Sequence, residues 1–214
     1  MISLFKINFF KRFVSAIIFV PLILIPLIIK GYILYFIFIT LLTLIFIEIK
    51  DLADRSRRKF FFLIYSFVCL VTFFLLIILI QTDFYKSKSV IQIVLIIWLF
   101  DTFSYLGGSI FKGKKLFPKI SKGKTVSGLI SGIFMTLLFY NFYLFIFDQE
   151  SLSYLSFPIL IILLSFIGDL LVSLLKRSAE VKDSGNLMPG HGGITDRMDS
   201  FIFVFFFLII FNIL

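Results

Sequence analysis

The sequence predicts an all-α integral membrane protein: a polytopic helical bundle with about seven transmembrane helices and polar loops that face the cytoplasm. Composition is the first observation behind this prediction. Hydrophobic residues make up 60% of the 214 residues and charged residues 15%, whereas a soluble domain is about 45–50% apolar with about a quarter of its residues charged. The second observation is that the apolar residues gather in runs long enough to cross about 30 Å of hydrocarbon. Such a chain cannot bury its apolar surface in one aqueous core.

The apolar runs give the expected helices in order. The first, 13–30, follows a basic segment as a signal peptide does, but it lacks a small-x-small cleavage site, so we expect a retained helix. Little more than Lys30-Gly31 separates it from the second run, which predicts a tight helical hairpin. The last run, 201–214, is short, and we expect it to span with tilt or local thinning, or to stop partway. The runs between them are 31–47, 60–80, 89–108, 126–147 and 154–175.

One membrane domain accounts for the chain, because no repeat period and no Pro/Ser-rich linker divides it. Within it, residues 1–97 hold the N-terminal transmembrane helices, and residues 98–214 form the C-terminal membrane region that carries the polar loops and the candidate chemistry. Gly128 and Gly132 form a GxxxG pair at the start of the run 126–147, which favours close helix packing. The lone Cys69 lies in an apolar run, which excludes a disulfide framework and a CxxC metal pair.

The distribution of basic residues predicts the orientation in the membrane. With the N-terminus in the cytoplasm, all of the 21 Lys and Arg residues except Lys30, Lys86 and Lys88 fall on inner segments. This is the asymmetry that membrane proteins show, and the reversed topology would violate it. The net charge of +9 is explained in the same way and does not require a nucleic-acid partner.

Two acidic residues lie within apolar runs, which marks candidate chemistry. Asp101 and Asp169 both belong to helices that run from the outside to the inside, and each lies about 18–22 Å along its helix. A carboxylate at membrane depth is expensive unless it faces a polar cavity or a partner. Their similar depth favours one shared site, although two carboxylates that each pair with a structural lysine would also satisfy the pattern.

The loops that follow these two helices are rich in charge. Residues 112–124 supply six lysines, and residues 176–200 alternate carboxylates with cations around a core that contains several glycines and a proline. Oxygen donors beside cations, without cysteine, suit Mg²⁺ that holds phosphates. Positive-inside bias alone would account for the cations, but it does not account for their alternation with carboxylates. In the second loop, the charged residues that we expect to act together are Lys176, Arg177, Lys182, Asp183, Asp196, Arg197 and Asp199.

His191 is the only histidine, which excludes zinc held by several imidazoles. In this glycine-rich loop it could act as a structural hydrogen-bonder, a phosphate contact or an acid/base. Gly108 through Lys114 fits the spacing GxxxxGK, but Lys115 replaces the required Ser or Thr, and a membrane helix precedes it instead of a strand. We therefore expect no P-loop.

These residues resemble the signature of the phosphatidate cytidylyltransferase (CDP-diacylglycerol synthase) family, S-x-x-K-R-x4-K-D-x-G-x2-L-P-x-H-G-G-x2-D-R-x-D. In this sequence the positions of that signature are Ser173, Lys176-Arg177, Lys182-Asp183, Gly185, Met188-Pro189, His191-Gly192-Gly193, Asp196-Arg197 and Asp199. Within this stretch only Met188 departs, mildly, because it replaces the usual Leu, Ile or Phe. The upstream family pattern is similar at Asp101-Thr102, Tyr105, Gly108, Lys115-Leu116, Pro118, Ile120-Ser121, Lys124-Thr125, Gly128 and Gly168-Asp169-Leu170. The resemblance covers about residues 98–200.

The resemblance implies transfer of CMP from CTP to phosphatidic acid, which gives CDP-diacylglycerol and pyrophosphate. It implies Mg²⁺, with a second cation as an option, at Asp169, Asp183, Asp196 and Asp199, and catalytic roles for Asp169, Asp183, Asp196 and Lys182. The expected substrate-binding residues are Asp101, Lys115, Ser121, Lys124, Thr125, Ser173, Lys176, Arg177, His191, Gly192, Gly193 and Arg197. It also implies an enzyme of the bacterial cytoplasmic membrane, a membrane-lipid partner and a homodimer, with no nucleic acid.

Several positions depart from the family pattern. Val172 replaces a glutamate, Ser127 a Glu or Gln, Ser109 a basic residue and Phe103 a small residue. Three alternatives stay open, of which the departures at Val172 and Ser127 favour only the last. One is a related CTP-dependent enzyme that acts on an ether lipid or a polyprenol. The others are a cation-coupled transporter, since carboxylates within the membrane also mark ion paths, and an inactive scaffold.

Overall fold

The computed structural model describes residues 21, 23–25, 27–29, 31–82, 84–147, 155–188 and 192–213. Most of the predicted first span, 13–30, and with it the predicted hairpin at Lys30, lies outside these residues. The elements are α2 (Gly31–Arg55), α3 (Lys59–Thr82), α4 (Phe84–Phe111), β1 (Lys115–Phe117), β2 (Ser121–Thr125), α5 (Val126–Phe147), α6 (Ser156–Ser178) and α7 (Thr195–Ile210).

The predicted helical membrane protein is confirmed. Within the described ranges, five helices are long and apolar enough to cross a bilayer: α2, α3, most of α4, α5 and α6. Many of their large apolar side chains are exposed on the outside of the bundle, as lipid-facing residues would be. Helix α7 has 16 residues, about 24 Å at 1.5 Å per residue, so it is shorter than the hydrocarbon thickness. The count of seven spans therefore stays a prediction.

One small sheet accompanies the helices in the described ranges: residues 115–125, which we expect from the sequence to be part of a loop, form a two-stranded antiparallel hairpin. Lys115 pairs with Thr125 and Phe117 with Ser121. Pro118 follows Phe117 at the turn, and the Ile120 amide donates to the Phe117 carbonyl at 3.1 Å. Proline presets the backbone dihedral at the second position of such a turn. Four of the six lysines in the predicted loop thus belong to an ordered hairpin: Lys115, Lys119, Lys122 and Lys124.

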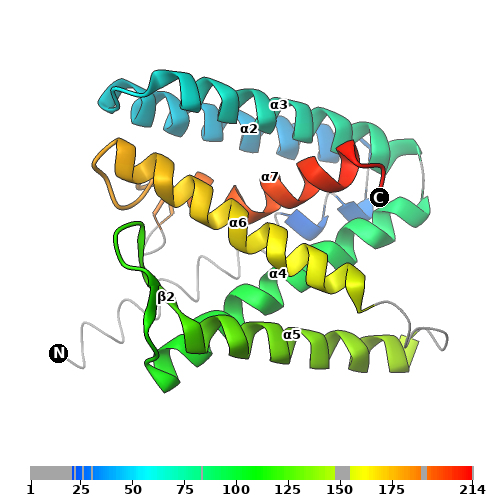
Figure 1. Cartoon of the computed structure of the whole chain (residues 1–214). Coiled ribbons are helices and arrows are strands. Elements are labelled where there is room, and N and C mark those ends of the chain that lie inside the picture. The colour runs from blue at the N-terminus through cyan, green and yellow to red at the C-terminus, as the bar shows by residue number, and fades with distance from the viewer. Residues whose placement is uncertain are drawn as a thin grey trace.

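The helices form three layers, which Figure 1 shows. Helices α2 and α3 pack together on one side, α4 and α5 pack together on the other, and α6 with α7 lies between them. Helix α7 contacts both α3 and α6. The α2–α3 connection, the hairpin and the α6–α7 connection all lie at the same end of the bundle, on the left of Figure 1. The polar segments of the chain therefore meet at one end.

Close packing between α4 and α5 fixes one wall of that end. A Cβ atom at Gly128 would lie 2.6 Å from the Ser104 carbonyl oxygen and 3.3 Å from the Cα of Gly108. At Gly132 a Cβ would collide with the Ser104 side chain and lie 3.0 Å from the Phe100 ring. The GxxxG pair therefore packs against α4, as the sequence predicts, and this contact places Asp101 of α4 beside the start of α5.

Candidate active site

A cavity of about 360 Å³ lies where the polar segments meet. Its walls come from α4, β2, the start of α5, α6, the α6–α7 connection and α7. The charged residues that line it are Asp101, Lys124, Asp169, Lys176, Asp183, Asp196, Arg197 and Asp199. Ser121, Thr125 and apolar side chains that include Phe100, Leu129 and Phe166 complete the lining. One cavity thus combines carboxylates, cations and an apolar wall.

Asp169 and Asp183 line this same cavity, as the prediction of one shared site requires. So do Asp101, Ser121, Lys124, Thr125, Lys176, Asp196, Arg197 and Asp199. Six other predicted site residues are not among the lining residues: Lys115, Ser173, Arg177, Lys182, Gly192 and Gly193. His191 lies outside the described residues.

Asp169 extends from α6 to an ion pair with the hairpin. Its Oδ2 atom lies 2.7 Å from Lys124 Nζ, while its Oδ1 atom accepts a long hydrogen bond, 3.4 Å, from Ser173 Oγ. Lys124 Nζ also lies 4.2 Å from the centre of the Phe166 ring and 3.4 Å from the Phe166 carbonyl oxygen. The side chain of Asp169 is 35% exposed and that of Lys124 15%. This pair therefore borders the open part of the cavity, where a phosphate could reach the lysine.

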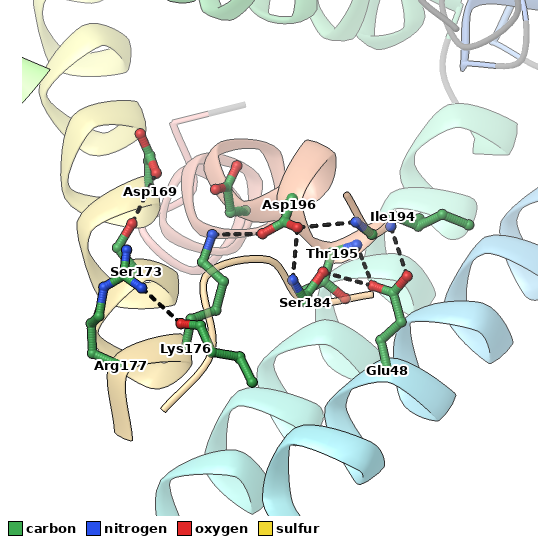
Figure 2. A network of polar contacts seen from close by, with 12 residues as sticks. Glu48, Asp169, Ser173, Lys176, Arg177, Ser184, Ile194, Thr195 and Asp196 are labelled. Atoms are coloured by element: carbon green, nitrogen blue, oxygen red, sulfur yellow. Dashed lines mark hydrogen bonds and ion pairs between the residues drawn. The ribbon is translucent and has the colours of Figure 1, made fainter. Parts of the chain in front are cut away.

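Asp196 is the centre of a second, more enclosed network, which Figure 2 shows. Its Oδ1 atom lies 2.6 Å from Lys176 Nζ, and the two side chains are only 7% and 11% exposed. Its Oδ2 atom accepts hydrogen bonds from the backbone amides of Ser184 at 2.8 Å and Gly193 at 3.0 Å. Asp196 thus joins α6, the α6–α7 connection and the start of α7.

Asp199 lies three residues further along α7, outside the five candidate spans. Burial raises the pKa of its carboxyl group well above the ordinary value, and the nearby Asp169 carboxylate raises it further. Lys176 lowers the pKa, Asp101 raises it, and the hydrogen bond from the Ser200 amide, at 2.8 Å, lowers it. Positive charge that enters the cavity would lower this pKa and so favour the ionised form of Asp199.

The structure corrects the predicted start of the last helix. The apolar run begins at residue 201, but α7 begins at Thr195, so Asp196, Arg197 and Asp199 are helical and do not belong to a loop. A carboxylate in the first turn of a helix is favoured by the helix dipole and by the free amides there. Because acidic and basic residues alternate at this helix start, it lacks the apolar pattern that identifies the run from residue 201.

Some predicted binding residues make structural contacts. Arg177 donates from Nε to the Ile120 carbonyl of the hairpin turn at 3.0 Å and from Nη1 to the Val181 carbonyl at 2.8 Å. Thr125 Oγ1 accepts from the Gly128 amide at 3.1 Å and so caps the start of α5, while it also lines the cavity. The predicted phosphate contacts of Arg177 would thus compete with its hold on the hairpin.

The other residues outside the cavity lining are of two kinds. Lys115 and Lys182 are exposed. Gly192 has a φ of +92° and exchanges backbone hydrogen bonds with Met188, at 2.9 and 3.2 Å. A positive φ is the conformation for which glycine is suited. Gly192 and Gly193 therefore shape the connection, and Gly193 acts through its amide on Asp196.

Sequence reasoning missed Glu48, which lies in α2 and far from the signature. Glu48 is 5% exposed, and its side chain accepts hydrogen bonds from the α6–α7 connection and the start of α7. A lone acidic residue within the apolar stretch IFIEIK was the available indication. Because Glu48 lies close to the polar end of the helix, it looks like an ordinary end-of-span residue.

Comparison with known proteins agrees with the signature. The model of the Cytidylyltransferase family matches residues 12–214. The chain belongs to this family.

Three relatives in this family are named phosphatidate cytidylyltransferase. The protein of Staphylococcus aureus (strain COL) is 41% identical over 128 residues, which cover 56% of this chain and 49% of that protein. The protein of Bacillus subtilis (strain 168) is 40% identical over 129 residues, 59% of this chain and 48% of that protein. The match to these two therefore spans about half of their length. The protein of Rickettsia typhi (strain Wilmington) is 32% identical over 209 residues, 92% of this chain and 89% of that protein.

The departures of this cytidylyltransferase family member from the signature pattern are accommodated locally. Val172 is 1% exposed and part of the apolar interior. Ser127 Oγ accepts from the Gly113 amide at 3.0 Å, Ser109 Oγ donates to the Leu106 carbonyl at 2.8 Å, and Phe103 stacks on Phe139 with ring centres 5.1 Å apart. None of the four is among the described residues that line the cavity.

The donor set of the cavity fits a hard cation such as Mg²⁺. Carboxylates supply oxygen, and none of the described residues that line the cavity offers sulfur. In the described ranges, no three Asp, Glu, His or Cys side chains are grouped closely enough to hold one ion by themselves. Mg²⁺ usually keeps waters and takes one or two carboxylates together with substrate phosphates. The residues therefore fit an ion that arrives with a phosphorylated substrate, and a four-carboxylate metal set stays a prediction.

Proposed function

We propose that the protein is a CTP:phosphatidate cytidylyltransferase, which transfers CMP from CTP to phosphatidic acid and so releases pyrophosphate and CDP-diacylglycerol for phospholipid synthesis. The observation that carries this proposal is the single cavity that combines carboxylates, cations and apolar side chains at the polar end of a membrane bundle. The names of the three relatives point to the same reaction.

The reaction joins two anions, so its barrier is largely electrostatic and positional. A phosphate oxygen of phosphatidic acid attacks the α-phosphorus of CTP, and the bond from that phosphorus to the oxygen bridging to the β-phosphate breaks. The phosphate monoester is already ionised near neutral pH, so no strong general base is needed. Lys124, Lys176 and Arg197 line the cavity and neutralise phosphate charge there. Arginine can hold two phosphate oxygens at once, whereas lysine acts as a point charge.

Lys124 is suited to receive the triphosphate because its ion pair lies at the open side of the cavity. An incoming phosphate would take over the ammonium group and free the Asp169 carboxylate. Lys176 is held more firmly, since its ammonium group and Asp196 are both nearly enclosed. We propose that Lys176 acts as a fixed charge and Lys124 as an exchangeable one.

The proposed cofactor is Mg²⁺, with room for a second cation. Asp169 and Asp199 are its best candidate ligands, and Asp183 and Asp101 face the same cavity. When bound, the ion supplies charge neutralisation at the α-phosphate and at the leaving pyrophosphate. Asp196 contributes chiefly by holding Lys176 and the connection in place, because both of its oxygens already accept hydrogen bonds.

We further propose the orientation and the partners. The polar end faces the cytoplasm of a bacterial cell, in keeping with the basic segments, so CTP arrives from the aqueous side. The lipid headgroup enters sideways from the inner leaflet along the apolar wall at Phe100, Leu129 and Phe166. A homodimer and a full set of seven spans stay predictions.

The test is incubation of purified protein with Mg²⁺ and CTP labelled in the cytosine ring, followed by lipid extraction, with separate acceptors. Phosphatidic acid, an ether-linked phosphatidic acid and a polyprenyl phosphate are compared at equal concentration in nanodiscs. The proposal expects labelled lipid with phosphatidic acid and at least tenfold less with polyprenyl phosphate. Preferential labelling of the ether lipid or the polyprenyl phosphate would reassign the acceptor, and no labelled lipid with any acceptor would reject the proposal.

A further inference from the structure

We propose that Glu48 of α2 is a positioning residue for this active site. Its carboxylate holds the α6–α7 connection and the start of α7 in the geometry that directs Asp196, Arg197 and Asp199 toward the cavity. The catalytic part of this inference rests on the proposed function, whereas its structural part does not. Glu48 comes from the N-terminal half of the chain, which the signature does not cover.

Three donors meet at the Glu48 carboxylate, as Figure 2 shows. Oε1 accepts from the Ile194 amide at 2.8 Å. Oε2 accepts from the Thr195 amide at 2.9 Å and from Ser184 Oγ at 2.9 Å. Each oxygen thus holds a backbone group at the start of α7, and the second also holds the connection. A buried carboxylate is tolerated because these donors replace the water it has lost.

Glu48 also caps the N-terminus of α7, because the N-cap residue of this helix does not do so with its own side chain. Ile194 is the N-cap residue, and its side chain makes no capping hydrogen bond. The first amides of a helix need acceptors, and a negative charge there is favoured by the helix dipole. A carboxylate from α2 therefore supplies both the acceptors and the charge from another part of the chain.

Two glycines, Gly185 and Gly193, lie directly against the Glu48 carboxylate. A Cβ atom at Gly185 would lie 2.7 Å from Glu48 Oε1 and 3.1 Å from its Cδ atom. One at Gly193 would lie 2.5 and 2.6 Å from the two carboxylate oxygens. A side chain at either position would therefore push the Glu48 carboxylate out of the place that it occupies.

The Glu48 contacts adjoin the cavity network directly. Ser184 gives its hydroxyl group to Glu48 and its backbone amide to Asp196. The Thr195 amide donates a hydrogen bond to Glu48, and Thr195 directly precedes Asp196 in the chain. A shift of the connection away from Glu48 would therefore displace Asp196 and the Lys176 ammonium that it holds.

The test variant is Glu48→Gln, which keeps the size of the side chain but turns one acceptor oxygen into a donor that faces backbone amides. The matched control is Asp54→Asn on the same helix, since Asp54 is exposed. Ser184→Ala is a milder variant that removes one of the three donors and leaves both backbone bonds. All are purified in nanodiscs and compared by size-exclusion elution and melting temperature before further measurement.

Two readouts are taken on the folded fraction. The first is hydrogen–deuterium exchange of peptides that cover residues 184–195, which does not depend on activity. The second is CMP transfer to phosphatidic acid, with kcat and the Mg²⁺ concentration for half-maximal activity. We expect Glu48→Gln to raise exchange over this segment about tenfold, to lower kcat at least tenfold and to raise the Mg²⁺ requirement. Ser184→Ala should change each two- to fivefold, and Asp54→Asn should match the wild type.

The outcomes separate the two proposals. Wild-type exchange in folded Glu48→Gln, or faster exchange with unchanged kcat and Mg²⁺ requirement, would overturn the positioning role. Faster exchange in Glu48→Gln beside a wild type that transfers no CMP would uphold the anchoring and reject the proposed function. If Glu48→Gln does not fold, Ser184→Ala decides by the same criteria.

Discussion

At the scale of single residues, the site contains two ion pairs of different character. Lys176 and Asp196 are almost enclosed, whereas Lys124 and Asp169 border the open cavity. An enclosed pair is costly to break from one side because the remaining charge stays buried without a partner. A more open pair exchanges partners readily and contributes little to stability. The two lysines should therefore respond differently to substitution.

For the enclosed pair, Asp196→Asn should destabilise the protein by about 3 kcal/mol and lower activity at least a hundredfold. The asparagine oxygen can still accept the Ser184 and Gly193 amides, but its NH₂ group then faces the Lys176 ammonium. Adding Lys176→Met removes this repulsion, so the double variant should regain most of the melting temperature and stay inactive. Thermal unfolding and CMP transfer measure the two effects. A double variant no more stable than Asp196→Asn would contradict the assigned pairing.

For the open pair, Lys124→Met should leave the melting temperature nearly unchanged and raise the KM for CTP about tenfold or more, since a hydrogen bond to a charged group contributes about 1.5–3 kcal/mol. Lys119→Met is the control, because Lys119 is an exposed residue of the same hairpin that does not line the cavity. Steady-state kinetics with varied CTP decide the matter. An equal change of the KM for CTP in both variants would mean that the total charge of the hairpin sets the affinity and that Lys124 has no specific role in binding CTP.

At the scale of elements, the hairpin is tied to the rest of the protein by Arg177. The guanidinium group spans two backbone carbonyls, one in the hairpin turn and one after α6. A lysine cannot reproduce this fork, although it keeps the charge. The identity of the side chain thus distinguishes an anchor from a phosphate contact.

Arg177→Lys should therefore behave like Arg177→Ala: both should loosen the hairpin and lower kcat/KM to a similar degree. Limited trypsin digestion at the hairpin lysines reports the loosening, and CMP transfer reports the activity. Substantial activity in Arg177→Lys beside loss in Arg177→Ala would instead support the phosphate contact that the signature implies.

How accurately the sequence predicts the bounds of an element depends on the contrast between its apolar residues and the polar residues that flank it. The run 126–147 predicts α5 to the residue, because Thr125 caps its start and Asp148 follows its end. The start of α7 is missed because its first two turns are polar, and the hairpin because its strands are short and rich in lysine. Charge placement and hydrophobic length are local properties, whereas both of these features depend on contacts with distant residues.

The candidate site likewise contains residues that local sequence patterns predict and one whose role depends on contacts with distant residues. Asp101, Asp169, Asp183 and Asp199 are predicted from membrane depth and from the signature, and the cavity brings them together. The role of Glu48 could not be predicted, because its partners lie more than a hundred residues away along the chain. A single acid near the end of an apolar helix carries no local mark of such a contact.

At the scale of the whole molecule, the connections at one end of the bundle carry the chemistry, and the orientation of this end can be measured. In a background with Cys69 retained, Gln81→Cys at the end of α3 and Glu180→Cys after α6 are treated with a membrane-impermeant maleimide. Cys69 is 0% exposed and should stay unlabelled. We expect Gln81→Cys to react in intact cells and Glu180→Cys to react only after permeabilisation, because the basic segments remain inside. The reverse pattern would invert the proposed topology.

The central claim is that CMP transfer takes place in the cavity that α4, α6, the α6–α7 connection and α7 enclose. The most direct measurement follows the phosphorus atoms of CTP with wild-type protein and with folded Asp169→Asn, in nanodiscs that contain phosphatidic acid and Mg²⁺. We predict that the α-³²P label enters the lipid and the γ-³²P label leaves as pyrophosphate with the wild type, and that Asp169→Asn loses at least a hundredfold in rate. Entry of the γ label into lipid, or near-normal α-label transfer by Asp169→Asn, would contradict the claim.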